Sequence, residues 1–295
     1  MTRGKKMILR AIGILCAAGA AVSIWELCSE IRPRAEAEGF YAKMREQVFP
    51  AGAQTGPKEG AAESRPDRGA PDWKVLEAWN PDICGWIYSP GTAIDYPIVQ
   101  GADNDWYLNH TVDQKKSMIG SIFLDSRNQA DFSDDVSVIY GHHIRGGRMF
   151  TPISGYKDQR YYEEHPVMYL YTPEADYRIE LFADEILDGG TGSFPFRFVD
   201  EKAREDWLEQ LQADGAFRKA PKPAPEERIL ALCTCTYEYQ DARYTVYGIM
   251  KKLEIEENEN DEGRTQDERN SENNSVNAVL PDAASDSGYD GACRG

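Results

Sequence analysis

The chain has 295 residues, of which 41% are hydrophobic, enough for one large core or two modest ones. Its net charge is −17, from 50 acidic and 33 basic residues, and no basic cluster suggests a nucleic-acid-binding face. A mean hydropathy of −0.60 excludes a protein with several membrane spans. Six cysteines are too few for a disulfide scaffold.

Residues 1–28 predict a basic cytoplasmic N-terminus followed by a transmembrane signal-anchor. Basic residues precede an uncharged run over residues 11–25, and a span needs about 20 mostly apolar residues, so the segment is short but feasible. The basic residues before the run predict that the rest of the chain is exported. A cleavable signal peptide is the alternative, because residues 17–21 are small. A buried amphipathic helix is the third interpretation.

Residues 29–71 predict a charged helix, to about residue 45, and then a Pro/Gly-rich stalk with little to bury. Residues 253–295 predict an acidic disordered tail. Of the net charge of −17, −9 lies from residue 254 onward, which leaves −8 for the remainder. We expect the tail to solvate the chain without a specific role, with a regulatory or wall-interacting tail as the alternative.

Residues 72–252 predict a single domain that is mainly strand. Short apolar runs occur at residues 94–99 and 121–124. Period-two alternation predicts further strands at residues 136–140, 167–171, 177–182, 229–232 and 244–249. Helical patterns occur at residues 73–79 and 201–213, the second inside a long insertion. Seven or eight short strands indicate a closed barrel or a sandwich.

Three residues of this domain could together perform nucleophilic catalysis. Cys235 ends an apolar strand, His142 ends another, and Arg243 begins the strand after a short polar connection. A thiolate attacks a carbonyl, an imidazole protonates the leaving amine, and a guanidinium stabilises the oxyanion. A buried cysteine at a strand end is also compatible with inert packing, so the spacing alone leaves catalysis open.

A metal site is the weaker interpretation of the same residue types. The closest cysteine pair is Cys233 and Cys235, which share one face of a strand, and structural zinc sites use two paired clusters. We expect no metal. A disulfide between these two cysteines would close a small strained ring, so we expect two reduced thiols.

These residues lie in segments that resemble the sortase family, and within it class B. The nucleophile motif T-L-x-T-C reads A-L-C-T-C at residues 231–235, and the histidine motif matches I-Y-G-H-H at residues 139–143. Residues 80–87, 94–101 and 103–110 continue the match in order. The resemblance covers essentially the whole domain. A papain-like protease is disfavoured because its cysteine precedes its histidine.

The resemblance implies a mainly β fold, a closed barrel of about eight strands, with an N-terminal helix and a helix in the long insertion before the Cys235 strand. It also implies that Cys235 is the nucleophile, His142 the acid and base, and Arg243 the oxyanion stabiliser, with no cofactor. Residues implied to bind substrate are Asn104, Leu108, Tyr140, Cys233 and Thr234. Ala231 replaces the first threonine of the motif, and we expect a small effect.

The implied function is that of a membrane-anchored cysteine transpeptidase on the outer face of a Gram-positive-type cell membrane. Its partners would be secreted proteins with a C-terminal sorting motif of the LPxTG, NPxTN or PPxTG type. The enzyme would cut the motif through a thioester and transfer the protein to a peptidoglycan amine. Alternatives are a pilin-polymerising sortase, a hydrolytic cysteine protease and a non-catalytic wall-associated β-barrel binding module.

Overall fold

The computed structural model describes residues 3–49, 68–144, 146–188, 194–215, 217–235 and 242–253. Most of the predicted stalk and the predicted acidic tail from residue 254 lie outside the described residues.

The chain begins with α1 (Arg3–Val48), a continuous helix of 46 residues. The C-terminal part of α1 packs on the barrel, where Tyr41, Met44 and Val48 are buried. The rings of Tyr41 and Tyr96 meet edge to face, with 5.1 Å between their centroids. These contacts attach α1 to the strand that carries Tyr96.

The transmembrane anchor predicted within residues 1–28 is not supported. Among the helices that the structure describes, none combines the length and the apolarity needed to cross a membrane.

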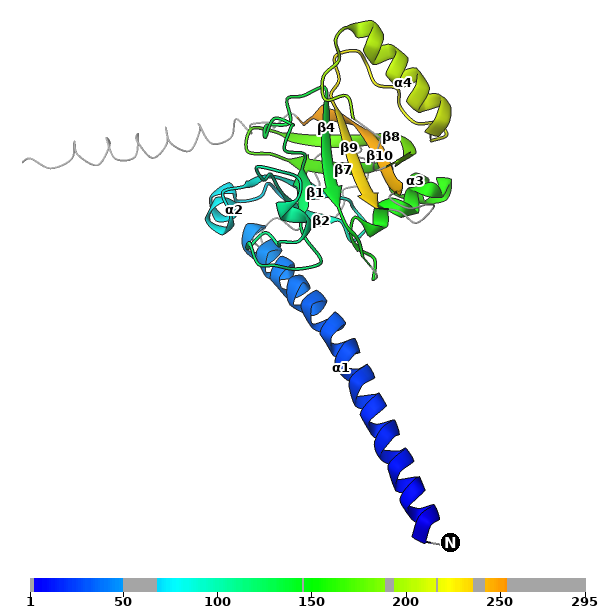
Figure 1. The fold of residues 1–295 in the computed structure, drawn as a ribbon. Coiled ribbons are helices and arrows are strands. Elements are labelled where there is room, and N and C mark those ends of the chain that lie inside the picture. The colour runs from blue at the N-terminus through cyan, green and yellow to red at the C-terminus, as the bar shows by residue number, and fades with distance from the viewer. Residues whose placement is uncertain are drawn as a thin grey trace, which may run out of the picture. The chain divides into compact units, whose positions relative to one another are not determined.

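Eight strands form a closed barrel in the order β1-β2-β3-β4-β9-β10-β8-β7 (Figure 1). They are β1 (Ile83–Tyr88), β2 (Asp95–Val99), β3 (Ile122–Leu124), β4 (Val136–Gly141), β7 (Val167–Tyr171), β8 (Asp176–Asp188), β9 (Ile229–Cys235) and β10 (Ala242–Lys252). The pairs β2–β3 and β4–β9 are parallel, and the other pairs are antiparallel. β5 (His143–Ile144) and β6 (Arg148–Met149) form a separate two-stranded sheet. The prediction of a closed barrel of about eight strands is confirmed.

The helices of the domain are α2 (Trp73–Trp79), α3 (Gln159–Glu164), α4 (Glu201–Gly215), and the 3-10 helices η1 (Trp106–Leu108) and η2 (Thr151–Lys157). α2 and α4 occupy the two predicted helical stretches. α2 begins at Trp73 because the Asp72 side chain accepts hydrogen bonds from the backbone N–H groups of Lys74 and Val75. The sequence pattern did not show β1, because five of its six residues are buried and alternation is absent.

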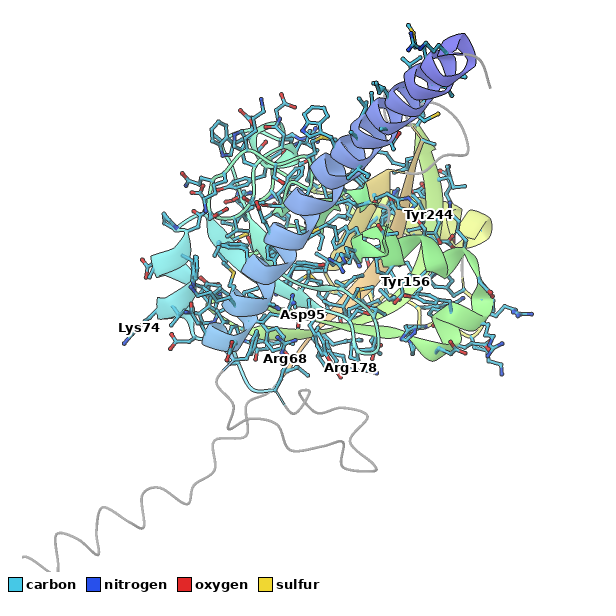
Figure 2. The ribbon with its side chains drawn as sticks, turned by 90° about the horizontal axis from the view of Figure 1, so that it is seen from below. Arg68, Lys74, Asp95, Tyr156, Arg178 and Tyr244 are labelled. Atoms are coloured by element: carbon cyan, nitrogen blue, oxygen red, sulfur yellow. The ribbon has the colours of Figure 1, made fainter. Side chains whose placement is uncertain are left out.

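Arg68 fixes the start of the barrel domain next to the end of α1. Its guanidinium lies 2.7 Å from the Asp95 carboxylate and 3.7 Å from the centre of the Phe49 ring (Figure 2). Asp95 also accepts a hydrogen bond of 2.7 Å from the indole N–H of Trp86. Arg68, through Phe49 on one side and Asp95 on the other, therefore connects the described segments that flank residues 50–67.

Two buried clusters lie on opposite faces of β9. Leu230 and Leu232 belong to the cluster inside the barrel, whereas Ala231 and Cys233 belong to the cluster outside it. Leu208 and Leu211 of α4 cover the outer cluster. The outer face of β9 and its neighbouring strands therefore carries a second core, and the candidate site lies at the end of this face.

Candidate active site

The ends of three neighbouring strands meet at one edge of the barrel. β9 lies between β4 and β10 (Figure 1). In the register, Gly141 pairs with Thr234, and Arg243 pairs with Cys235. Because β4 and β9 are parallel, their carboxyl ends share an edge, and the antiparallel β10 begins there. His142, the backbone of Cys235, and Arg243 are thus brought to the same edge.

A cleft of about 190 Å³ opens at this edge. Its lining residues are Asn104, Asp105, Leu108, Phe123, Arg127, Tyr140, Gly141, His142, Cys233, Thr234 and Arg243. They include His142, Arg243 and all five residues that the resemblance implied in substrate binding. His143, in contrast, belongs to the small sheet of β5 and β6 and is absent from this lining.

The imidazole of His142 is held by the backbone of η1. Its Nε2 lies 2.6 Å from the carbonyl oxygen of Leu108. A carbonyl oxygen only accepts hydrogen bonds, so Nε2 carries a proton and donates it. Nδ1 is then the ring nitrogen left to exchange a proton with a substrate.

Gly120 permits the close approach of the His142 ring to the carbonyl oxygen of Leu108. Its φ is +61°, and a Cβ at this position would lie 2.6 Å from the Leu108 carbonyl oxygen and 3.0 Å from His142 Cδ2. Any side chain would press on both partners of the hydrogen bond. Gly120 is therefore part of the geometry that fixes His142.

Thr234 joins the ends of β9 and β4. Its buried hydroxyl donates a hydrogen bond of 2.8 Å to the carbonyl oxygen of Gly141, the residue before His142. Gly141 is itself tightly enclosed, because a Cβ there would lie 2.4 Å from Ile122 Cδ1. Thr234 lines the cleft, and its hydroxyl connects the two strands.

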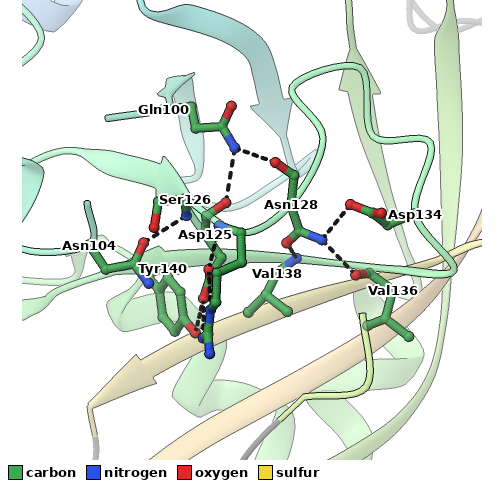
Figure 3. Close-up of polar contacts among 10 residues, drawn as sticks. Gln100, Asn104, Asp125, Ser126, Asn128, Asp134, Val136, Val138 and Tyr140 are labelled. Atoms are coloured by element: carbon green, nitrogen blue, oxygen red, sulfur yellow. Dashed lines mark hydrogen bonds and ion pairs between the residues drawn. The ribbon is translucent and has the colours of Figure 1, made fainter. Parts of the chain in front are cut away.

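Arg243 and Tyr140 face each other across β9. The guanidinium carbon of Arg243 lies 5.8 Å from the centre of the Tyr140 ring, within the range of a cation–π contact. The Tyr140 hydroxyl donates a hydrogen bond of 3.0 Å to the carboxylate of Asp125 (Figure 3). Burial, followed by the charge of Asp125, raises the pKa of Tyr140, so the phenol stays protonated at neutral pH.

Asp125 and Arg127 are site residues that the sequence analysis missed. Arg127 lines the cleft and makes a two-point ion pair with the fully buried Asp125 carboxylate, with distances of 2.9 and 2.7 Å. The available signal was the polar segment D-S-R-N at residues 125–128, directly after the strand predicted at residues 121–124. Polar residues at a strand end often line a site.

The cysteines of the domain differ in their surroundings. Burial raises the pKa of the Cys84 thiol to about 12, so this thiol is protonated at neutral pH and a poor nucleophile. Cys233 is 1% exposed and pairs in register with Tyr140 and Thr245. Among the described residues, no group of three His, Cys, Asp or Glu side chains is arranged to hold a metal ion.

Known proteins resemble this chain over the whole barrel domain. Sortase B of Listeria monocytogenes is 33% identical over 175 residues, which cover 59% of this chain and 71% of the relative. This chain belongs to the sortase B family. The sortase B structure from Clostridium perfringens is 32% identical, with a TM-score of 0.58, and covers 61% of this chain and 100% of that one. No family model matches the chain.

A Staphylococcus aureus sortase B–substrate complex shares the fold, with a TM-score of 0.65, 24% identity, and coverage of 75% of this chain and 99% of that one. The assignment to class B made from the sequence is therefore confirmed. Sortases of class B are cysteine transpeptidases that sort proteins to the cell wall at the cell surface.

Proposed function

We propose that this chain is an active sortase B that cleaves a C-terminal sorting motif of secreted proteins and transfers them to a peptidoglycan amine. The observation that carries the proposal is the register between β9 and β10, which sets Arg243 opposite Cys235. His142 follows β4, whose last residue pairs with Thr234, next to Cys235. A nucleophile, a proton carrier and a fixed cation are thus proposed to act from three adjacent strand ends.

In the proposed reaction, the Cys235 thiolate attacks the carbonyl carbon of the motif threonine, and the carbonyl oxygen becomes an oxyanion. The guanidinium of Arg243 stabilises that oxyanion, because it stays charged and presents several N–H donors. The C–N bond then breaks, and the His142 imidazolium gives its proton to the leaving amine. A thioester on Cys235 remains.

In the second half of the reaction, an acceptor amine attacks the thioester carbonyl. His142 accepts a proton from the attacking nitrogen, the C–S bond breaks, and Cys235 leaves as a thiolate. The products are a new amide and the regenerated pair. A thioester favours this outcome because it is more reactive toward amines than an oxygen ester, and a cleft that excludes water limits hydrolysis.

The residues proposed to contact the sorting peptide are Asn104, Leu108, Tyr140, Cys233 and Thr234. Leu108 is 39% exposed and offers an apolar contact at the lip of the cleft. The side-chain oxygen of Asn104 accepts a hydrogen bond of 2.8 Å from the backbone N–H of Ser126, which orients the amide at the lining of the cleft.

We also propose that residues 1–28 attach the enzyme to the outer face of the cell membrane, on the basis of the basic cluster and the uncharged run that follows. Residues 29–71 would then connect the anchor to the catalytic domain of residues 72–252, ahead of the tail of residues 253–295. A tethered enzyme meets exported substrates at a high effective concentration.

A peptide cleavage assay on the full chain tests the proposal. Quenched peptides with LPxTG, NPxTN and PPxTG motifs are incubated with and without an amine acceptor, using the wild type, Cys235→Ala and the matched Cys233→Ala. We expect cleavage of one motif, ligation to the amine, and loss of both only in Cys235→Ala. Hydrolysis of the peptide without ligation to the amine would identify a protease. Peptide that binds without being cleaved, equally to the wild type and to Cys235→Ala, would identify a binding module. Ligation to a pilin lysine in preference to a peptidoglycan amine would identify a pilin polymerase.

A further inference from the structure

A buried carboxylate lies beneath the cleft. Asp125 directly follows β3 and is 0% exposed. Its backbone N–H donates a hydrogen bond of 2.8 Å to the carbonyl of Val138 in β4, and its own carbonyl accepts one of 2.9 Å from Gln100 (Figure 3). The position of this carboxylate is therefore fixed by the barrel itself.

The two oxygens of Asp125 bind two side chains that line the cleft. The Nε of Arg127 donates to Oδ1 at 2.9 Å and its Nη2 donates to Oδ2 at 2.7 Å. Oδ2 also accepts the hydroxyl of Tyr140 at 3.0 Å. A two-point ion pair fixes the plane of both groups, so the oxygen that receives Tyr140 is fixed in direction as well.

Tyr140 connects this carboxylate to Arg243. The hydroxyl end of the ring is bound by Asp125, and the face of the ring lies 5.8 Å from the guanidinium carbon of Arg243. A cation over an aromatic face is held by the electrostatics of the ring. A change in the ring position therefore shifts the preferred position of the guanidinium.

The Asp125 carboxyl group is ionised at neutral pH. Burial raises the pKa of its carboxyl group, but the hydrogen bonds from Arg127, Asn104 and Tyr140 together outweigh burial and hold the pKa below its usual range. A charged acceptor strengthens the hydrogen bond from the Tyr140 hydroxyl.

We propose that Asp125 is a positioning residue for Arg243, and that it acts through the hydroxyl and ring of Tyr140. The inference rests on the proposed function, in which Arg243 stabilises the oxyanion. The oxyanion forms only during the reaction, so a misplaced guanidinium lowers kcat and leaves KM little changed.

The test compares Asp125→Asn with Asp134→Asn in the full chain. Asp134 is a matched control because it is 3% exposed, binds Asn128 at 2.9 Å, pairs with Arg197 at 3.0 Å, and is not part of the cleft lining (Figure 3). We expect Asp125→Asn to lower kcat about tenfold, the loss of a cation–π contact of ordinary strength. Per folded molecule, Asp134→Asn leaves kcat unchanged.

A double-mutant cycle identifies the route of the effect. If Asp125 acts through the Tyr140 hydroxyl, Asp125→Asn has less than about a twofold effect on kcat in a Tyr140→Phe background. An undiminished effect in that background, or equal losses in Asp125→Asn and Asp134→Asn, would overturn the inference. Should Asp125→Asn fail to fold, Tyr140→Phe alone removes the same hydrogen bond and is expected to lower kcat with KM unchanged.

A structural measurement separates this inference from the proposed function. In a crystal structure of Asp125→Asn, or of Tyr140→Phe, we expect the Arg243 guanidinium to leave its place over the ring. An unmoved guanidinium would overturn the inference even if the wild type is an active sortase. Wild-type protein that cleaves no peptide would contradict the proposed function, and the crystal structure would still decide the placement of Arg243.

Discussion

Arg243 lies directly opposite Cys235 on the antiparallel pair of β10 and β9. The pairing of these two strands therefore brings a cation to the candidate nucleophile. Arg243 also lines the cleft, where a fixed guanidinium could stabilise an oxyanion.

The first prediction concerns Arg243. Arg243→Lys keeps the charge but loses the planar fork of donors, and we expect kcat for peptide cleavage to fall about 100-fold. Arg160→Lys is the matched control, because Arg160 is an exposed residue of α3 paired with Glu164. Steady-state kinetics measure the effect, and equal activity of Arg243→Lys and wild type would exclude an oxyanion role for the guanidinium.

The second prediction concerns the link between β9 and β4. Thr234→Val keeps the shape of the side chain but leaves the Gly141 carbonyl without its donor, at a cost of about 1–3 kcal/mol of unfolding free energy. Thr234→Ser retains the hydroxyl and is the control. Urea denaturation compares the three proteins. If valine and serine destabilise the chain equally, the hydrogen bond contributes nothing.

The third prediction concerns Gly120. In Gly120→Ala the new methyl group meets the Leu108 carbonyl and His142, and the left-handed backbone adds strain. We expect kcat to fall about tenfold because the imidazole is displaced. Met118→Ala, at a side chain that is 93% exposed, is the nearby control. Activity retained by Gly120→Ala would show that the Leu108 contact does not set the histidine geometry.

The fourth prediction concerns pH. The pKa of Asp125 is lowered in the folded state, because hydrogen bonds outweigh burial. The stabilisation that the ionised group gives is therefore complete above the unfolded pKa of about 4 and is lost as pH falls through the lower folded pKa. We expect the difference in unfolding free energy between wild type and Asp125→Asn to be constant from about pH 5 to 7 and to shrink near pH 3. Denaturation at these three pH values measures it, and a constant difference would contradict the assignment.

The fifth prediction concerns the N-terminus. If residues 1–28 attach the chain to a membrane, the full chain sediments with membranes and a chain that begins at residue 29 does not. Both chains retain the part of α1 that packs on the barrel, including Tyr41 and Met44. Equal distribution of the two proteins between membrane and soluble fractions would reject the anchor.

The sequence was informative where its signals are local. Alternation located β7, in which the buried Met168 and Leu170 alternate with the partly exposed Val167 and Tyr169. It missed β1, which is buried on both faces and therefore lacks a period of two.

The residues of the candidate site also fall into two groups: those that local sequence motifs identified, and those that only strand pairing brings to the cleft. The motifs at residues 139–143 and 231–235 named His142 and Cys235 as candidates, since reactive side chains can be recognised one by one. Asp125 and Arg127 could not be found by this route. Their contact with the cleft arises because β3 pairs with β4, which sets Asp125 beside Val138 and within reach of Tyr140.

The sequence by itself thus determined the types of secondary structure, the candidate nucleophile, proton carrier and cation, and the membership of the sortase B family. The tertiary structure decided that β4 and β9 run parallel, that their ends meet the start of β10, and that Asp125 lies under Tyr140. The physical reason is that propensity and alternation act between neighbours in the chain, whereas strand order and register depend on which distant faces pack together.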